Sequence, residues 1–242
     1  LAQKGKKVAG DQPNTRGGPA EPGSSPVNGR THLMGNRAII TGQGQSTGIY
    51  LHWNGGEDSV KAFLRYAQLK GLPQLEQSET AILPLAVVVT NFFGNDGLAI
   101  ALETGITNPR HVGETWDLDN GLYVVAGWQI VNHYGHNPHQ HAHAMADMLA
   151  EIDQAQPSRD QLGAEVLNAV PVPVSQLAIG DRIYIPGQRE TATITTRTNN
   201  GWVTNQWPGE ASNPNNLIRT ETVQLVERPH ETAESAAPVE VH

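Results

Sequence analysis

The segment GIYLHWNGG, residues 48–56, constrains the fold of this chain most, because it joins a strand pattern to a helix pattern. On the two-residue period of a strand, the polar-tipped side chains of Tyr50, His52 and Asn54 share one face, and apolar side chains alternate with them. The two glycines at its end break the strand. The segment therefore predicts a half-buried strand with one polar face, followed directly by a helix.

The flanking residues extend this pattern in both directions. Residues 37–41 read as a strand and residues 42–47 as a Gly- and Gln-rich turn, which predicts a hairpin with the strand at residues 48–53. Asp58 is the expected N-cap of the following helix. The apolar residues of that helix follow the i, i+3, i+4, i+7 rule: Val60, Phe63, Leu64 and Ala67.

The rest of the first domain is predicted from shorter patterns. Residues 78–93 are read as a buried helix whose first turn is bent or delayed by Pro84. Residues 98–103 read as a strand, and residues 122–131 as its antiparallel partner, led by an Asp-Asn-Gly turn. We therefore expect an α+β domain over residues 34–135 with the order β-β-α-α-β-β.

The second half of the chain changes in character. Residues 136–170 are rich in histidine, alanine and acidic residues, and the spacing of their apolar residues predicts a linker with helical content. Residues 171–228 read as a small all-β module, for which we expect an SH3-like barrel. Its predicted strands are residues 181–185, 191–197, 201–206 and 222–226.

The two ends of the chain have little to bury. Residues 1–33 are rich in Gly, Pro and Ser, and residues 229–242 are acidic, so both are expected to be disordered tails. Met34 stands where the ordered pattern begins and is a candidate for the true start of the protein.

Composition bounds the class of protein. The 242 residues contain no cysteine, and no apolar run approaches the roughly 18 residues that cross a bilayer, so we expect a soluble, cytoplasmic protein without a membrane partner. The net charge is −8, and no region expected to fold has an excess of cations. Binding to a phosphate backbone needs clustered cations, so general nucleic-acid binding is not expected.

The polar face of residues 48–56 is a candidate pocket. In an enzymatic interpretation, His52 acts as acid or base beside Tyr50, with a carboxylate from Asp117 or Asp119. In the alternative interpretation this is a half-buried edge strand whose glycines only turn the chain. The sequence contains no phosphate-binding loop and no dinucleotide fingerprint, so no cofactor is expected, and the absence of a companion nucleophile favours a non-enzyme.

A histidine cluster lies at the start of the predicted linker. It comprises His133, His136, His139, His141 and His143. His139 and His143 are an i, i+4 pair, and with His141 they are candidate metal ligands. Because Pro138 interrupts the cluster, a solvated histidine tract is the favoured alternative.

The expected barrel carries candidate binding residues of its own. Trp202 and Trp207 could hold a peptide or stacked bases, as aromatic residues of small barrels do. A nucleic-acid-binding role would also use Arg182, Arg189 and Arg197. In the alternative interpretation, Trp202 fills the core of the module.

Five motifs stand out in the first domain: MGNRAI at residues 34–39, residues 48–56, SVKAFL at residues 59–64, NFFG at residues 91–94 and DNGLY at residues 119–123. Together they resemble a family of small uncharacterised proteins of phages, prophages and their bacterial hosts. The resemblance covers about residues 34–131. It implies a discrete first domain and a setting in mobile-element biology, but no activity.

These observations favour a non-enzymatic interaction protein, a phage or prophage accessory factor that acts on a host protein. Two compact modules joined by a linker suit multivalent binding. A hydrolase or transferase using His52 with an aspartate, and a nucleic-acid-binding protein using the C-terminal module, stay as alternatives.

Overall fold

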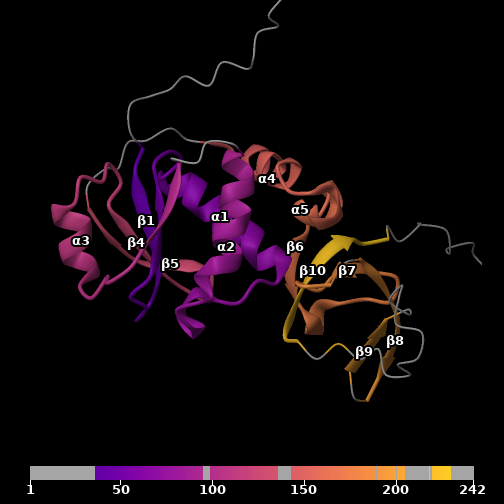
Figure 1. Cartoon of the computed structure of the whole chain (residues 1–242). Helices are drawn as coiled ribbons and strands as arrows, with labels where there is room; N and C mark the ends of the chain where they lie inside the picture. The colour runs from indigo at the N-terminus through magenta and orange to yellow at the C-terminus, as the bar shows by residue number, and fades with distance from the viewer. Residues whose placement is uncertain are drawn as a thin grey trace, which may run out of the picture. The chain divides into compact units, whose positions relative to one another are not determined.

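The computed structural model describes residues 36–94, 99–135, 143–188, 190–199, 201–204, 218 and 220–229. All of them belong to one compact unit, Met34–His242. Within these residues the chain forms two five-stranded sheets together with α and 3-10 helices (Figure 1). The expected mixture of α and β structure is therefore confirmed.

The first sheet has the strand order β3-β2-β1-β4-β5. Its strands are β1 (Ala38–Gly42), β2 (Gly48–Leu51), β3 (Ile100–Glu103), β4 (Leu122–Ala126) and β5 (Gln129–Tyr134). The strands β1 and β4 are parallel, whereas the pairs β1–β2, β2–β3 and β4–β5 are antiparallel. The predicted hairpin of β1 and β2 is confirmed.

Helices cover both faces of this sheet (Figure 1). On one face lie α1 (Glu57–Lys70), α2 (Ile82–Phe93) and α4 (Met145–Gln154), whose apolar residues share one core with Ile49 and Leu51 of β2. On the other face lies α3 (Pro109–Thr115), and Tyr50 packs against the small core there. The alternation of β2 thus separates two cores, as the strand period predicts.

The first helix follows its predicted periodicity. The four predicted core residues of α1 are at most 1% exposed, and Gly71 ends the helix in the left-handed conformation, with φ of 66°. The predicted N-cap is wrong, since the N-cap is Gly56. Asp58 lies inside the first turn, and its Oδ2 accepts a hydrogen bond of 2.6 Å from the backbone N–H of His143.

Two expectations about the first sheet differ from the structure. The order is β-β-α-α-β-α-β-β, because α3 intervenes before β4. The predicted pairing of residues 98–103 with residues 122–131 is wrong: β3 pairs with β2, and residues 122–131 are divided between β4 and β5 by a turn at Gly127 and Trp128. Both residues of this turn have positive φ, as a tight two-residue hairpin requires.

The second sheet has the strand order β6-β10-β7-β8-β9. Its strands are β6 (Val170–Pro173), β7 (Arg182–Tyr184), β8 (Ala192–Thr198), β9 (Gly201–Thr204) and β10 (Thr222–Glu227). Ile183, Ile194 and Val223 lie in its core. Among the described residues this sheet has two ends, β6 and β9, and no closed barrel is found.

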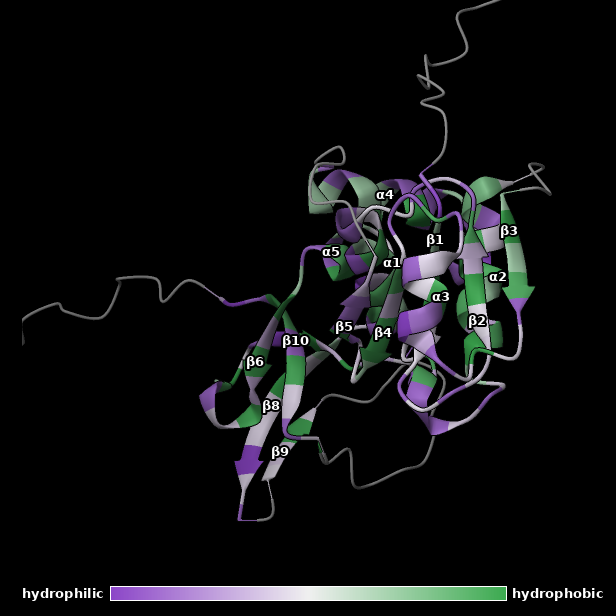
Figure 2. Cartoon of the chain, turned by 90° about the vertical axis from the view of Figure 1, so that its left-hand side faces the viewer, coloured by the Kyte–Doolittle hydropathy of each residue, from purple (hydrophilic) through white to green (hydrophobic). Residues whose placement is uncertain are grey.

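The segment between the sheets is packed against the helices of the first domain, with α4 on α1 and α2 (Figure 2). The expected helical content is present as α4 and the short helices η2 (Ser158–Asp160) and α5 (Ala164–Leu167). Asp153 of α4 is 6% exposed, and Tyr66 of α1 donates a hydrogen bond of 2.7 Å to its Oδ1. Within the described residues this segment is thus part of the fold rather than a free connection.

Two further 3-10 helices complete the described elements, η1 (Leu75–Gln77) and η3 (Val174–Gln176). The hydroxyl of Tyr184 on β7 donates a hydrogen bond of 2.9 Å to the backbone oxygen of Leu69 on α1, which connects the second sheet to the first domain. In the part of the chain that the structure describes, no helix has the length and apolar character needed to span a membrane.

Candidate functional site

One group of polar side chains gathers at the end of the first sheet where β1 begins and β2 ends. We call it the Arg37 cluster, and it comprises Arg37, Tyr50, His52, Asp117 and Asp119. The residues meet because β4 runs parallel to β1, so the loop that precedes β4 lies beside the start of β1.

Arg37 holds both aspartates. Its Nε lies 2.8 Å from Oδ2 of Asp119, and its Nη1 lies 2.7 Å from Oδ2 of Asp117. Hydrogen bonds from Arg37 lower the pKa of Asp119 although burial opposes this, and the two carboxylates raise the pKa of Arg37. The guanidinium therefore fixes the loop and keeps Asp119 ionised.

Tyr50 and His52 form the second half of the cluster. The Tyr50 hydroxyl lies 2.9 Å from Nδ1 of His52, so the strand period does bring these two side chains together. Burial raises the pKa of Tyr50. The His52 ring lies edge-on to Trp53, with 4.5 Å between the ring centroids.

The geometry gives the aspartates a partner other than the one expected from the sequence. Among the described contacts, Asp117 and Asp119 bond to Arg37, and the hydrogen-bond partner of the His52 ring is Tyr50. The pair of Tyr50 and His52 can pass a proton between hydroxyl and imidazole. Asn54, the third residue of the predicted polar face, lies beyond the end of β2 with a φ of 53°.

The histidine cluster is only partly described. His139 and His141 lie outside the described residues. His143 contributes its backbone N–H to Asp58, and His133 on β5 places Nε2 2.6 Å from the backbone oxygen of Asn120. No group of three or more potential metal ligands is found among the described residues.

In the second sheet, Trp202 is 7% exposed and belongs to the core, which agrees with the alternative interpretation of this residue. The Arg197 guanidinium lies 5.1 Å from the centroid of its ring. Arg182 pairs with Glu165 at 2.7 Å and with Glu227 at 2.8 Å. Trp207 and Arg189 lie outside the described residues.

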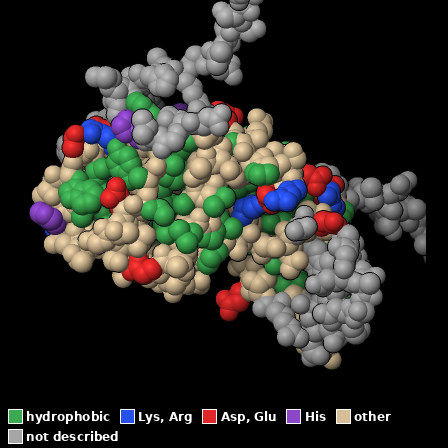
Figure 3. Space-filling view, in the orientation of Figure 1, with side chains coloured by type: hydrophobic (Ala, Val, Ile, Leu, Met, Phe, Trp, Pro, Cys, Tyr) green, Lys and Arg blue, Asp and Glu red, His purple; other side chains and the backbone are tan. Residues whose placement is uncertain are grey.

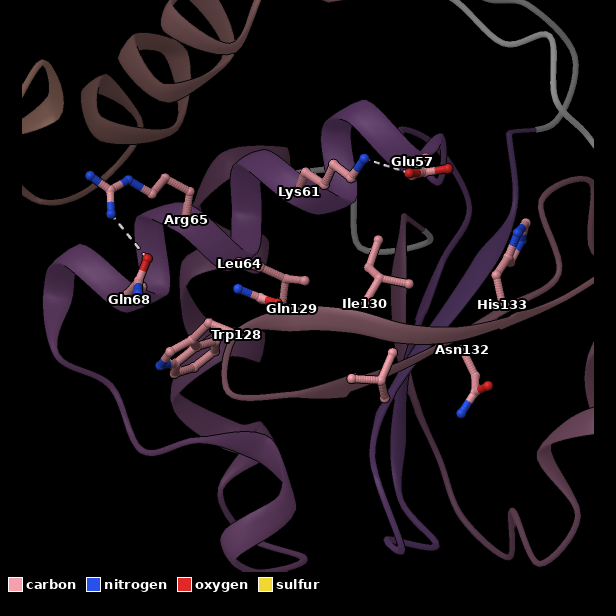
Figure 4. Close-up of a pocket in the computed structure, with 11 residues that line it drawn as sticks. Glu57, Lys61, Leu64, Arg65, Gln68, Trp128, Gln129, Ile130, Asn132 and His133 are labelled. Carbon is pink, nitrogen blue, oxygen red and sulfur yellow. Dashed lines mark hydrogen bonds and ion pairs between the residues drawn. The ribbon is translucent and has the colours of Figure 1, made fainter. Parts of the chain in front are cut away.

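A groove of about 530 Å³ runs between α1 and β5, and we call it the α1–β5 groove (Figure 4). Its strand wall is formed by residues 128–133. The helix wall consists of Glu57, Lys61, Leu64, Arg65 and Gln68. Figure 4 shows Ile130 and His133 on the side of β5 that faces α1.

The helix wall carries charges that are already partnered. Lys61 pairs with Glu57 at 2.5 Å. The Arg65 guanidinium donates to Gln68, to the backbone oxygen of Ala169 and to Gln224 at 3.0, 3.0 and 2.7 Å, and burial lowers its pKa. Sequence reasoning missed this groove, because its two walls lie about seventy residues apart in the chain and only the packing of α1 on the sheet brings them together.

No protein-family model matches this chain, and no curated protein or solved structure is significantly similar to it. The geometry described above is therefore the basis for any functional proposal.

Proposed function

We propose that this protein is a non-enzymatic interaction protein that binds an extended segment of a partner protein in the α1–β5 groove. The observation that carries the proposal is the shape of the groove, an open channel between one helix and the edge strand of the first sheet. The two walls offer a bound segment side-chain contacts from α1 on one side and from β5 on the other.

The length of the groove fits a peptide. Its helix wall extends from Glu57 to Gln68, eleven residue steps along α1. At about 1.5 Å per residue this wall is about 16 Å long, which matches about five residues of extended chain. Such a length favours a linear segment over a compact small molecule.

The chemistry of the groove supports the same ligand class. Trp128 and Ile130 are partly buried apolar residues of the strand wall, whereas the pair of Glu57 and Lys61 lies at one end of the groove. We therefore propose that apolar side chains of the partner anchor it, with polar contacts at the rim.

The setting of this proposal is a phage or prophage, where the partner is a host protein. The resemblance of residues 34–131 to proteins of phages and prophages supports this setting. For the second sheet we propose the SH3-like barrel expected from the sequence. The pairing of the last strand, β10, with β7 supports it, because closure requires strands distant in sequence to meet.

An enzymatic role is the second candidate, and the Tyr50–His52 hydrogen bond is the observation that favours it. We rank it lower, because Arg37 engages the two candidate aspartates. Nucleic-acid binding has less support, because two glutamates partner Arg182 and the core buries Trp202.

Selection from a library of random peptides displayed on phage tests the proposal. With the full chain as bait, we expect enriched peptides with apolar anchors, whose affinities calorimetry then measures. Lys61→Trp places a large ring on the helix wall and should abolish binding. Lys61 is 54% exposed, so this change leaves the core of the domain intact.

The matched control is Glu151→Trp, which also replaces an exposed charged residue on a helix but lies away from the groove. Peptide binding should be unchanged in this variant. Equal affinities of the two variants, or no enrichment of any peptide on the full chain, would refute the proposal.

A further inference from the structure

An uncharged apolar strip faces solvent on α2. The helix has the sequence ILPLAVVVTNFF, without a single charged residue, and buries residues such as Leu85 and Phe92 against the sheet. Its outer side still exposes Leu83 at 44% and Val87 at 60%. Figure 3 shows hydrophobic side chains gathered over the face on which α2 lies in Figure 1.

The strand β3 lies at the same edge of the unit as α2 (Figure 2). It ends the first sheet, and Ile100 packs against the core to which α2 contributes. Leu102 of β3 pairs with Ile49 of β2, so its side chain points to the α2 side of the sheet, and it is 48% exposed. The exposed apolar strip thus continues from the helix to the strand.

The backbone of β3 offers hydrogen-bonding groups on its outer edge. The N–H of His52 donates to the backbone oxygen of Ala99, so these two residues form a hydrogen-bonded pair of the β2–β3 ladder. Hydrogen-bonded and non-hydrogen-bonded pairs alternate along an antiparallel ladder, so this bond determines the type of every other pair. Ala101, opposite Tyr50, therefore directs its N–H and C=O toward β2. The corresponding groups of Ile100 and Leu102 point outward, where the described part of the chain provides no further strand.

Two of the other edge strands in the described residues, β5 and β6, carry features that discourage pairing with another chain. In β5, the register shift leaves Val131 as an extra residue in the ladder, and β6 contains Pro171 and Pro173. In β3 there is no register shift, no proline and no lysine. Edges that lack such protection are the ones suited to pairing.

We propose that β3 and α2 form a self-association surface, on which a second copy of this chain pairs through an antiparallel β3–β3 contact around a two-fold axis. In a two-fold contact each surface meets the same surface of the second copy, so both the strand edge and the helix strip must be complementary to themselves. The uncharged α2 satisfies this condition. Each copy carries a net charge of −8, which makes an uncharged face the favoured approach for another copy.

Among the registers that the alternation of β3 allows, one pairs both of its outward-facing residues. Ile100 has outward backbone groups and lies opposite Leu102 of the partner subunit, and the reverse pair is equivalent by symmetry. These two pairs form four hydrogen bonds. Ala101 then faces its own copy as the non-hydrogen-bonded pair, with the Cα atoms about 4.5 Å apart, a separation that a methyl side chain fits.

The same register keeps the like charges apart. Glu103 lies opposite Ala99 of the partner subunit, and the two Glu103 residues are four residue steps apart, which is about 14 Å. The α1–β5 groove lies at the opposite edge of the sheet, so it stays accessible in the dimer. Two grooves in one assembly would increase binding to a repetitive partner through avidity.

Single cysteines test the register directly, because the natural chain contains none. We expect Ala101→Cys to form a covalent dimer under mild oxidation with glutathione disulfide, since the predicted Cα separation lies within disulfide range. Glu103→Cys is the matched control on the same strand and the same face, and it should stay uncrosslinked. An uncrosslinked Ala101→Cys variant, or equal crosslinking of both, would overturn the proposed pairing.

A second measurement tests the helix strip without a disulfide crosslink. Light scattering after gel filtration should give the mass of a dimer for the natural chain and of a monomer for Val87→Lys. Ile179→Lys, at an apolar residue that is 63% exposed and lies outside both the groove and the β3–α2 surface, should leave the dimer intact. A monomeric natural chain, or dissociation by Ile179→Lys but not by Val87→Lys, would refute the surface.

Discussion

Replacing Asp153 by alanine should destabilise the whole fold, although the residue lies in a segment whose sequence suggests a linker. The carboxylate is 6% exposed. It accepts hydrogen bonds from the Tyr66 hydroxyl at 2.7 Å and from the backbone N–H groups of Leu162 and Gly163 at 2.6 and 2.9 Å. It therefore connects α4 to α1 and to the turn before α5.

The size of the effect follows from these three donors. Each buried donor without an acceptor costs about 1–3 kcal/mol, and water entering the space left by the side chain recovers part of this. We expect Asp153→Ala to lower the free energy of unfolding by about 3–5 kcal/mol, a large part of the total stability of a typical domain. Tyr66→Phe removes one donor and should cost about 1 kcal/mol.

Urea denaturation followed by circular dichroism measures both variants and their combination. Because the two residues share a hydrogen bond, the double variant should lose less stability than the sum of the single losses. A loss below about 1 kcal/mol for Asp153→Ala would show that α4 is not integral to the fold. A separate early transition for residues 143–170 would refute the reasoning in the same way.

Three further predictions concern the first domain. Hydrogen bonds from Arg37 lower the pKa of Asp119 in the folded state. The contribution of these bonds to the free energy of unfolding is therefore complete above the unfolded pKa of about 4, and it is lost as pH falls through the pKa of the folded state. Urea titrations should show the difference between the natural chain and Asp119→Asn shrinking below about pH 4. Gly71→Ala should lower the melting temperature more than Gly187→Ala does. A Cβ on Gly71 would lie only 2.4 Å from the Gly187 nitrogen, whereas a Cβ on Gly187 would lie 3.8 Å from the Gly71 Cα. Phe63 is fully buried, so Phe63→Ala should cost about 3–5 kcal/mol in urea denaturation, and a cost near zero would contradict its place in the core.

The Arg37 cluster shows how far sequence reasoning reaches for the candidate site. The strand period correctly placed Tyr50 and His52 on one face, and the structure joins them by a hydrogen bond. The partner of Asp119 was not predictable, because Arg37 is 82 residues away and only the parallel pairing of β1 and β4 brings them together. The exposed strip at Val87 was not predictable either, because the sequence of a helix that is apolar on all sides does not indicate which side is buried.

Local patterns determined the elements of this protein. The periodicity of residues 57–70, the alternation around Tyr50 and the turn residues between β8 and β9 each depend on neighbours a few positions away, and each element formed as predicted. Tertiary structure alone decided that β1 pairs with β4 and β2 with β3, that α4 packs on α1, and where the α1–β5 groove lies. The physical reason is that pairing and packing are chosen by the total apolar surface that distant segments bury together, and no single segment contains that information.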